Sequence, residues 1–370
     1  MEYTITELAG LAIDTIVRKF PAAKLPPEGH FHYHQGVFLS GVEKLSEASG
    51  KEEYFPYIQS WVDAMTSPSG EPYCFNPGAL DDLQPGILLF GLLQRTHNEK
   101  YRSLLDHLTS LLPDWDKNEE GGYFHMTGMN DQMWLDGLYM AGPLAVRYGM
   151  EYQKPEFITL AFHQMRLMYH HCLKKESNLL LHGWDCSKKA EWANPDTGCA
   201  PEIWGRAMGW FLIGGLDMLE LLPKKHEERV WAEKVIAELA ASVLKYQDSQ
   251  TGLWYQVVDK PNQPGNWHEV SCSMLFTCAV LRCIRLGLLP QENMQQAIQG
   301  IRGILSCVRI ENENTFLLNR ICVGTGIGSY DYYIARETST NDLHGMGAYL
   351  LLCAEAVKVT KEKFAVGQKK

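Results

Sequence analysis

The chain lacks any apolar run long enough to cross a bilayer, and its first residues lack the basic start and apolar core of a signal peptide. Its ten cysteines form no CxxC pair and no spacing typical of a disulfide framework. These absences favour a cytoplasmic protein with reduced thiols and no membrane partner. We expect Cys172, Cys278, Cys283 and Cys353, which lie in apolar helical stretches, to be core residues.

Basic residues are also scarce. Lysine and arginine number 34 against 44 acidic residues, which gives a formal net charge of -10 and a sequence pI near 5.7. Such a balance argues against a nucleic-acid partner. No HExxH motif or Cys/His grouping occurs, so we expect neither a metal nor another cofactor. No Pro/Gly/Ser-rich linker divides the 370 residues, which predicts one domain over 1–370.

Helical periodicity is present along almost the whole sequence. It predicts twelve helices, near 3–19, 34–48, 53–66, 82–97, 99–112, 130–148, 154–173, 202–222, 226–246, 268–287, 291–306 and 340–358.

The connections between these helices alternate in character. Six helices follow loops rich in Gly, Pro, Trp, His and Asp, whereas the other six follow short, plain turns such as Gly50-Lys51. Stacked helical hairpins that close into a ring place all the loops of one kind on one rim. We therefore predict an all-α fold, an (α/α)6 barrel, with functional loops around one mouth. Short β-hairpins are expected in those loops, at 73–75, 122–125, 179–184, 253–258 and 316–318.

Asp136 is the most informative single residue. It lies among Trp134, Leu135, Leu138 and Tyr139, within the stretch predicted to be helical from residue 130. Burial of an unpaired carboxylate raises its pKa, so that the group stays protonated near neutral pH. This is the behaviour of a general acid, and the alternative is a solvated aspartate on a polar helix face.

A second cluster of useful side chains follows at Trp204, Arg206 and Trp210. Arginine gives bidentate hydrogen bonds to a carboxylate, and indole rings cover the less polar face of a sugar. This combination suits a sugar that carries a carboxylate. The alternative is an arginine stacked on tryptophan for packing alone.

Several other motifs give weaker evidence of function. A histidine on a rim loop is more often a hydrogen-bonding partner than a metal ligand; the candidates are His32, His34, His125 and His182. His170 and His171 lie within a long helix and are expected to be structural. The run from Gly324 to Gly328 lacks the lysine of a phosphate loop, so we expect a flexible turn there.

Taken together, the motifs resemble those of the unsaturated rhamnogalacturonyl hydrolases, glycoside hydrolase family 105, which are related to the unsaturated glucuronyl hydrolases of family 88. The resemblance covers nearly the whole chain. It rests on the segments 31–36, 80–86, 182–185, 204–210, 266–271 and 341–345, together with those around His125 and Asp136.

The resemblance implies an (α/α)6 barrel that hydrolyses oligosaccharides left by polysaccharide lyases. These substrates end in a 4,5-unsaturated uronate, which is a vinyl ether. An acid protonates C4, water adds at C5, and the hemiketal opens to release the next sugar. The carboxylate-spacing rule of ordinary glycosidases then does not apply.

The same resemblance assigns the roles. Asp136 is similar to the family's general acid/base, and Asp81 to a second carboxylate that orients the sugar or water, although Asp82 is adjacent. The residues implied to line the uronate subsite are Tyr33, His125, His182, Trp204, Arg206 and Trp210, with Arg206 meeting the carboxylate. The expected partner is an unsaturated disaccharide, bound by a monomer or homodimer.

Two functions of other classes stay open at this stage. A sugar epimerase of the N-acylglucosamine type shares the barrel but uses histidine bases. A carbohydrate-binding or scaffold protein needs no buried carboxylate.

Overall fold

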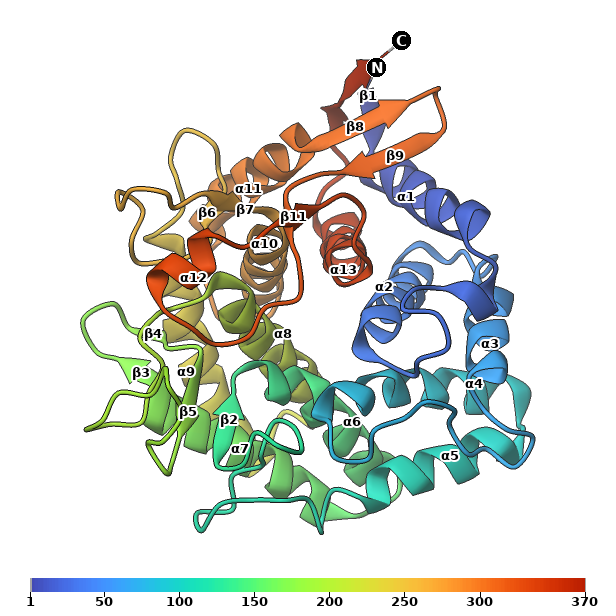
Figure 1. The fold of residues 1–370 in the computed structure, drawn as a ribbon. Helices are drawn as coiled ribbons and strands as arrows, with labels where there is room; N and C mark the ends of the chain where they lie inside the picture. The colour runs from blue at the N-terminus through green and yellow to red at the C-terminus, as the bar shows by residue number, and fades with distance from the viewer. Residues whose placement is uncertain (1, 370) are drawn as a thin grey trace.

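Helices that alternate between an inner and an outer ring make up most of the protein (Figure 1). The computed structural model describes residues 2–369. The inner helices are α2 (Tyr33–Ser49), α4 (Leu88–Thr96), α6 (Asp136–Glu151), α8 (Gly205–Leu221), α10 (Val270–Arg285) and α13 (Leu343–Val359). The outer helices are α1 (Ile5–Lys19), α3 (Phe55–Ala64), α5 (Glu99–Ser110), α7 (Pro155–Cys172), α9 (Glu227–Leu244) and α11 (Met294–Ser306).

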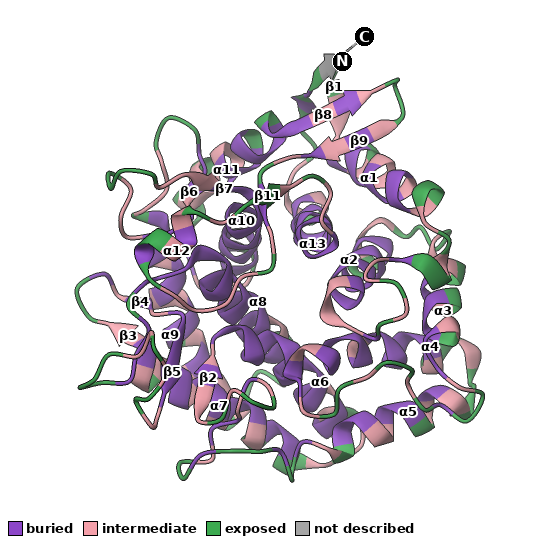
Figure 2. Cartoon of the chain, in the orientation of Figure 1, coloured by how far each residue is buried: buried purple, intermediate pink, exposed green. Residues whose placement is uncertain are grey.

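The difference between the two rings follows from their sequences. In α10, every residue from Val270 to Ile284 is buried, as expected of a helix that is surrounded by others. In α11, the buried residues Ala297, Gly300, Ile301 and Ile304 recur at helical spacing and form one face. Figure 2 shows the same pattern around the ring, with mostly buried inner helices and exposed outer surfaces. The predicted (α/α)6 barrel is confirmed.

The two ends of the barrel differ in their connections, as predicted. Each inner helix is entered from an outer helix through a long segment, for example 111–135 before α6 and 173–204 before α8. The return from an inner to an outer helix is short, as in the two residues between α4 and α5. The long segments therefore gather at one end, which is the mouth.

Short strands stiffen the segments at the mouth. β2 (Gln132–Trp134) pairs with β5 (Gly183–Asp185), and β6 (Trp254–Tyr255) pairs with β7 (His268–Glu269). Further antiparallel pairs join β3 (Leu173–Lys174) to β4 (Leu179–Leu180), and β10 (Ile321–Cys322) to β11 (Thr338–Ser339). β8 (Val308–Glu311) lies between β9 (Thr315–Leu318) and the parallel β13 (Gly367–Lys369).

Three local predictions need correction. Residues 132–134 form β2, so α6 begins at Asp136 rather than near residue 130. The pieces expected at 73–75 and 122–125 are not strands, since the second contains only an isolated bridge of Tyr123 with Lys117 and the bridge nearest the first is at Pro72. A short helix, α12 (Tyr330–Ile334), follows the glycine-containing loop and was not predicted.

The ring closes where its first and last inner helices, α2 and α13, pack together. A Cβ atom on Gly347 would lie 2.5 Å from the backbone of Val37, so only glycine permits this approach of the two helices. Nearby, β1 (Glu2–Thr4) pairs with β12 (Lys363–Ala365), which brings the two ends of the chain side by side (Figure 1). This seam therefore joins segments from opposite ends of the sequence.

Within residues 2–369, none of the helices is both long and apolar enough to cross a membrane. The ten cysteines are free thiols, and the four predicted to be core residues are buried, as are four others.

Candidate active site

Backbone hydrogen bonds connect successive loops around the mouth. The amide of Leu80 donates to the carbonyl of His125 at 3.1 Å, and the amide of Leu135 donates to that of His182 at 3.0 Å. The amide of His182 in turn donates to the carbonyl of Glu202 at 3.1 Å. The candidate residues from three of the long segments are thus attached to one backbone network, which fixes their relative positions.

Asp136, His182 and Tyr333 form a line of hydrogen bonds. The Nε2 atom of His182 lies 3.2 Å from Oδ2 of Asp136, and its Nδ1 atom lies 2.6 Å from the hydroxyl of Tyr333. His182 and Tyr333 are fully buried, and Asp136 is 8% exposed. Burial lowers the pKa of His182 despite the hydrogen bond to Asp136. A neutral ring satisfies both partners when Tyr333 donates to Nδ1 and Nε2–H donates to the carboxylate.

The pKa expected for Asp136 was wrong in direction. Burial by itself raises the pKa of this carboxyl, but the hydrogen bond from His182 and the electrostatic influence of His182, His125 and Arg206 outweigh burial. The pKa of Asp136 therefore lies below its usual range. The sequence argument considered only apolar neighbours, whereas the histidine and arginine that contact the site come from distant loops.

The pKa of Asp81 is shifted in the opposite direction. Its Oδ1 atom lies 3.5 Å from Nε2 of His125, a separation with no hydrogen bond. The ring of His125 stacks on Trp134 with centroids 4.4 Å apart and planes 7° apart. Burial raises the pKa of Asp81, and the charges of Asp136 and Asp82 add to that effect, although His125 opposes it.

The neighbouring Asp82 is occupied elsewhere. Its Oδ1 atom lies 2.6 Å from Nδ1 of His32, and its Oδ2 atom accepts a hydrogen bond from the amide of Asn76 at 2.7 Å. Asp82 therefore ties its own loop to the start of α2. Of the two adjacent aspartates, Asp81 is the one beside His125.

Tyr33 lies within the electrostatic reach of both candidate carboxylates. Burial, followed by the negative charge of Asp81, raises the pKa of its phenol well above the usual range. Arg206 and Asp136 also act on this phenol, in opposite directions. Tyr33 therefore stays a neutral phenol that can donate or accept a hydrogen bond.

Trp204 and Arg206 belong to the same neighbourhood but are almost completely covered. The guanidinium of Arg206 lies 4.4 Å from the ring centre of Trp204, and Trp204 lies 4.7 Å from the ring of His182. The Nη1 and Nη2 atoms of Arg206 donate to the carbonyls of Cys322 and Val323 at 2.5 and 2.7 Å. With 2% exposure, Arg206 holds the backbone of the loop after β10 and adds a positive charge near Asp136.

Trp210 is the candidate that the structure does not bring together with the others. It lies one turn further along α8 than Arg206, is 1% exposed, and stacks on Tyr139 at 4.7 Å. Its place in the structure is the packing between α8 and α6.

The sequence profile of Glycosyl Hydrolase Family 88 matches residues 10–360. The chain belongs to this family. Membership makes it a glycoside hydrolase, as the resemblance predicted.

Known proteins are similar to this family 88 protein in structure or in sequence. A glycoside hydrolase of family 105 from C. acetobutylicum has a solved structure that is 29% identical, with a TM-score of 0.89, covering 95% of this chain and 99% of that one. The unsaturated rhamnogalacturonyl hydrolase YesR of Bacillus subtilis is 24% identical over 79% of both chains. The unsaturated 3S-rhamnoglycuronyl hydrolase of Formosa agariphila is 23% identical over 61% of this chain and 58% of its own.

Two side chains of the family 88 protein were missed as site residues. Trp134 stacks on His125 and also approaches His182 edge-on at 5.5 Å. Tyr333 contacts His182 from α12, a helix that the sequence pattern did not predict. Trp134 lies two residues before Asp136, and this closeness in sequence was a signal that its ring belongs to the site. No sequence signal pointed to Tyr333.

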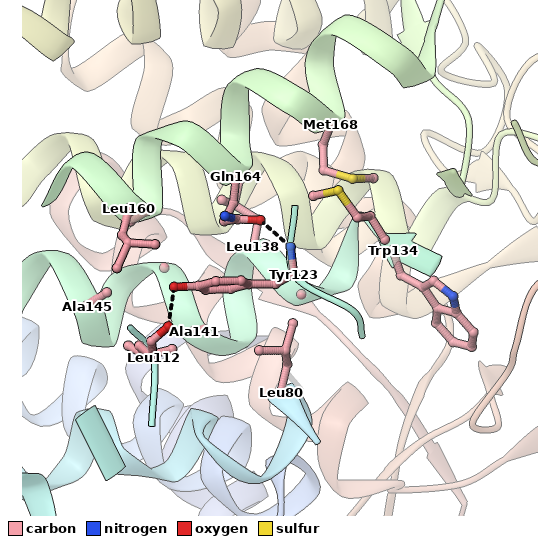
Figure 3. Close-up of a pocket in the computed structure, with 14 residues that line it drawn as sticks. Leu80, Leu112, Tyr123, Trp134, Leu138, Ala141, Ala145, Leu160, Gln164 and Met168 are labelled. Carbon is pink, nitrogen blue, oxygen red and sulfur yellow. Dashed lines mark hydrogen bonds between the residues drawn. The ribbon is translucent and has the colours of Figure 1, made fainter. Parts of the chain in front are cut away.

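An apolar cavity behind α6 borders this site at Trp134 (Figure 3). It is lined by residues such as Leu112, Leu138 and Leu160. The side-chain oxygen of Gln164, another lining residue, accepts a hydrogen bond from the backbone N–H of Tyr123. Its volume of about 30 Å³ holds no more than one or two water molecules. It is too small for a sugar and is a gap between α6 and α7.

Proposed function

We propose that this glycoside hydrolase removes a 4,5-unsaturated uronate from the non-reducing end of lyase-generated oligosaccharides, and that its substrate is unsaturated galacturonyl-rhamnose from rhamnogalacturonan. Family membership and the similarity to YesR support this substrate class. The observation that carries the proposal is the buried line from Tyr333 through His182 to Asp136. It holds one carboxyl in a fixed orientation beside a second, Asp81.

In the proposed reaction, Asp136 delivers a proton to C4 of the vinyl ether. Positive charge then develops at C5, and the Asp136 carboxylate takes a proton from the water that adds there. The resulting hemiketal opens and releases the rhamnose and a keto-uronate. Proton and water are both accounted for by one residue, so no second catalytic carboxylate is needed.

The lowered pKa of Asp136 sets a condition on this mechanism. In the free enzyme Asp136 is a carboxylate at neutral pH, because His182, His125 and Arg206 stabilise its charge. A bound uronate adds a negative charge and excludes water, and both effects raise the pKa of a nearby carboxyl. Asp136 therefore acquires its proton as the substrate binds.

The other candidate residues have supporting roles in this proposal. Asp81 and Tyr33 are only partly buried, so they orient the hydroxyls of the sugar or the attacking water. Trp134 presents a partly exposed ring beside them. Trp204 and Arg206 are buried behind His182, where they fix its ring and the loop after β10. His125 lies beside Asp81 and opposes the rise in its pKa, and Trp210 supports the packing of α8 against α6.

A second candidate substrate is a glucuronyl-derived unsaturated disaccharide with the same vinyl ether. The similarity to the Formosa agariphila hydrolase, which is named for a rhamnoglycuronyl substrate, supports an activity outside rhamnogalacturonan. The protein should be mixed with each disaccharide while the ultraviolet absorbance of the C4=C5 bond is followed. Loss of absorbance with the galacturonyl-rhamnose substrate alone is the expected result. Loss with the glucuronyl substrate alone moves the protein to the second activity. No loss with either contradicts the proposal that the substrate is an unsaturated uronate.

A further inference from the structure

A cluster of two histidines and an aspartate lies at the seam of the barrel, outside the groups used in the proposed reaction. His34 is the second residue of α2, and Asp342 and His344 begin α13. These are the two inner helices that close the ring. One possible ligand atom from each residue lies within 4.8 Å of the other two.

The individual distances show a converging arrangement. The Nδ1 atom of His344 lies 2.7 Å from Oδ1 of Asp342, and Nε2 of His34 lies 3.8 Å from the same oxygen. The two imidazole rings stand at 73° with centroids 5.1 Å apart. The nitrogen and oxygen atoms thus surround one small volume rather than pairing in separate directions.

His344 is already oriented as a metal ligand. Its Nε2–H donates to the carbonyl of Cys322 at 3.0 Å, which leaves the lone pair of Nδ1 directed at the cluster. A metal-bound histidine usually has its second nitrogen held by a carbonyl or carboxylate in this way. His344 is fully buried, and its Nδ1 atom has no hydrogen bond of acceptable geometry. A buried nitrogen in that state calls for a partner.

The cluster also has access to solvent. A cavity of about 350 Å³ between α1 and the start of α13 is lined by His34, Asn341 and Asp342. A water molecule from this cavity could complete the coordination of an ion held by three protein ligands. Two imidazole nitrogens, one carboxylate oxygen and one open position are a ligand set that suits Zn²⁺ and related divalent transition metals.

We propose that His34, Asp342 and His344 bind one divalent transition-metal ion, which joins α2 to α13 at the closure of the barrel. The ion stabilises the ring because its ligands come from the two ends of the sequence and exist together only in the folded protein. The proposal does not depend on the reaction at Asp136. The competing arrangement is a plain ion pair between Asp342 and a protonated His344, which needs no metal.

Zn²⁺ itself is the probe. The full chain, first treated with a chelator, should be incubated with Zn²⁺, desalted, and analysed for metal content and thermal unfolding. We expect one retained equivalent and a rise in Tm that grows with the Zn²⁺ concentration. His34→Gln and Asp342→Asn should each lose the retained ion and the rise in Tm. His34 is partly exposed, so His34→Gln is expected to fold, and circular dichroism checks this.

The matched control is His268→Gln. His268 forms a similar pair with Asp248 at 3.6 Å but has no second histidine beside it, so this variant should retain the ion. The proposal is overturned if the wild type retains no Zn²⁺. It is equally overturned if His34→Gln and Asp342→Asn retain as much as the wild type, because the ion then lies elsewhere.

Discussion

The two carboxylate–histidine pairs at the mouth consist of the same residue types, and yet the pKa values of their carboxyls are shifted in opposite directions. Asp136 accepts a hydrogen bond from His182, whose other nitrogen is occupied by Tyr333. Asp81 is close to His125 without a hydrogen bond, and the Nδ1 atom of His125 is buried without a partner. The pKa of Asp136 is lowered, whereas that of Asp81 is raised.

Burial alone does not set the direction of the pKa shift of these carboxyls. Both are desolvated, but only Asp136 has a hydrogen-bond donor that is itself held in one tautomer by a third residue. Arg206 adds to the difference, because its charge acts on Asp136 and is not among the main influences on Asp81. In the proposed reaction, where Asp136 alone exchanges protons with the substrate, this difference marks Asp81 as a residue with another role.

The largest expected effect is on kcat, and it should distinguish the role of Asp136 from that of Asp81. Asp136→Asn should lower kcat by about 10²- to 10⁴-fold, since it removes the group that exchanges protons with the substrate. Asp81→Asn should act mainly on KM. The assay is the loss of ultraviolet absorbance of the double bond. The roles are reversed if Asp81→Asn has the larger effect on kcat, in which case the carboxyl with the raised pKa is the proton donor.

The second prediction concerns Tyr333, the last residue in the line of hydrogen bonds from Asp136 through His182. Tyr333→Phe should lower kcat about 10-fold with little change in KM, because His182 is no longer held in the tautomer that donates to Asp136. Losing this donor raises the pKa of Asp136, so the loss of activity on the alkaline side should move to higher pH.

A pH profile of kcat and kcat/KM measures the change caused by Tyr333→Phe. Tyr330→Phe is the control, since its hydroxyl is on the same helix but donates to Gln263 and Pro264. A lower kcat with an unmoved pH profile would mean that Tyr333 only supports the local fold.

The barrel could be predicted from the sequence because its helices are long and periodic, and because the loops before Tyr33, Asp136 and His268 differ from the plain return turns. The start of α6 was placed six residues early. The residues before Asp136 have an apolar pattern that fits a helix, but pairing of β2 with β5 decides their conformation. Strand pairing between distant loops leaves no local signal.

The candidate residues were recognisable by type, but their partners were not. Arg206 was expected to meet a substrate carboxylate, and in the structure its donors reach the carbonyls of Cys322 and Val323, more than 100 residues away. Tyr333 likewise comes from 151 residues beyond His182. A pKa depends on these contacts, which is why the pKa of Asp136 could not be predicted from its sequence neighbours.

Arg206→Lys separates charge from geometry around Asp136. Lysine keeps the positive charge but cannot bond both carbonyls, so the free energy of unfolding should fall by about 2 kcal/mol. KM should rise a few-fold as the loop after β10 loosens, while the pH profile stays in place. Urea unfolding and steady-state kinetics measure the two effects. A large rise in KM with unchanged stability would instead mean that Arg206 binds the substrate directly.

The smallest expected effect is on the free energy of unfolding, which should change in opposite directions when Asp81 and Asp136 are each replaced by asparagine. At pH 7, Asp81→Asn should stabilise the protein and Asp136→Asn should destabilise it, each by about 1 kcal/mol.

A raised pKa means that the stability due to Asp81 is present at low pH and is lost as the pH rises through its folded pKa. A lowered pKa means that the stability due to Asp136 is present at neutral pH and is lost only as the pH falls through its folded pKa. Urea unfolding at pH 7 and pH 4 should therefore show the advantage of Asp81→Asn shrinking while the penalty of Asp136→Asn largely persists. Equal changes at the two sites would show that their environments do not differ in charge.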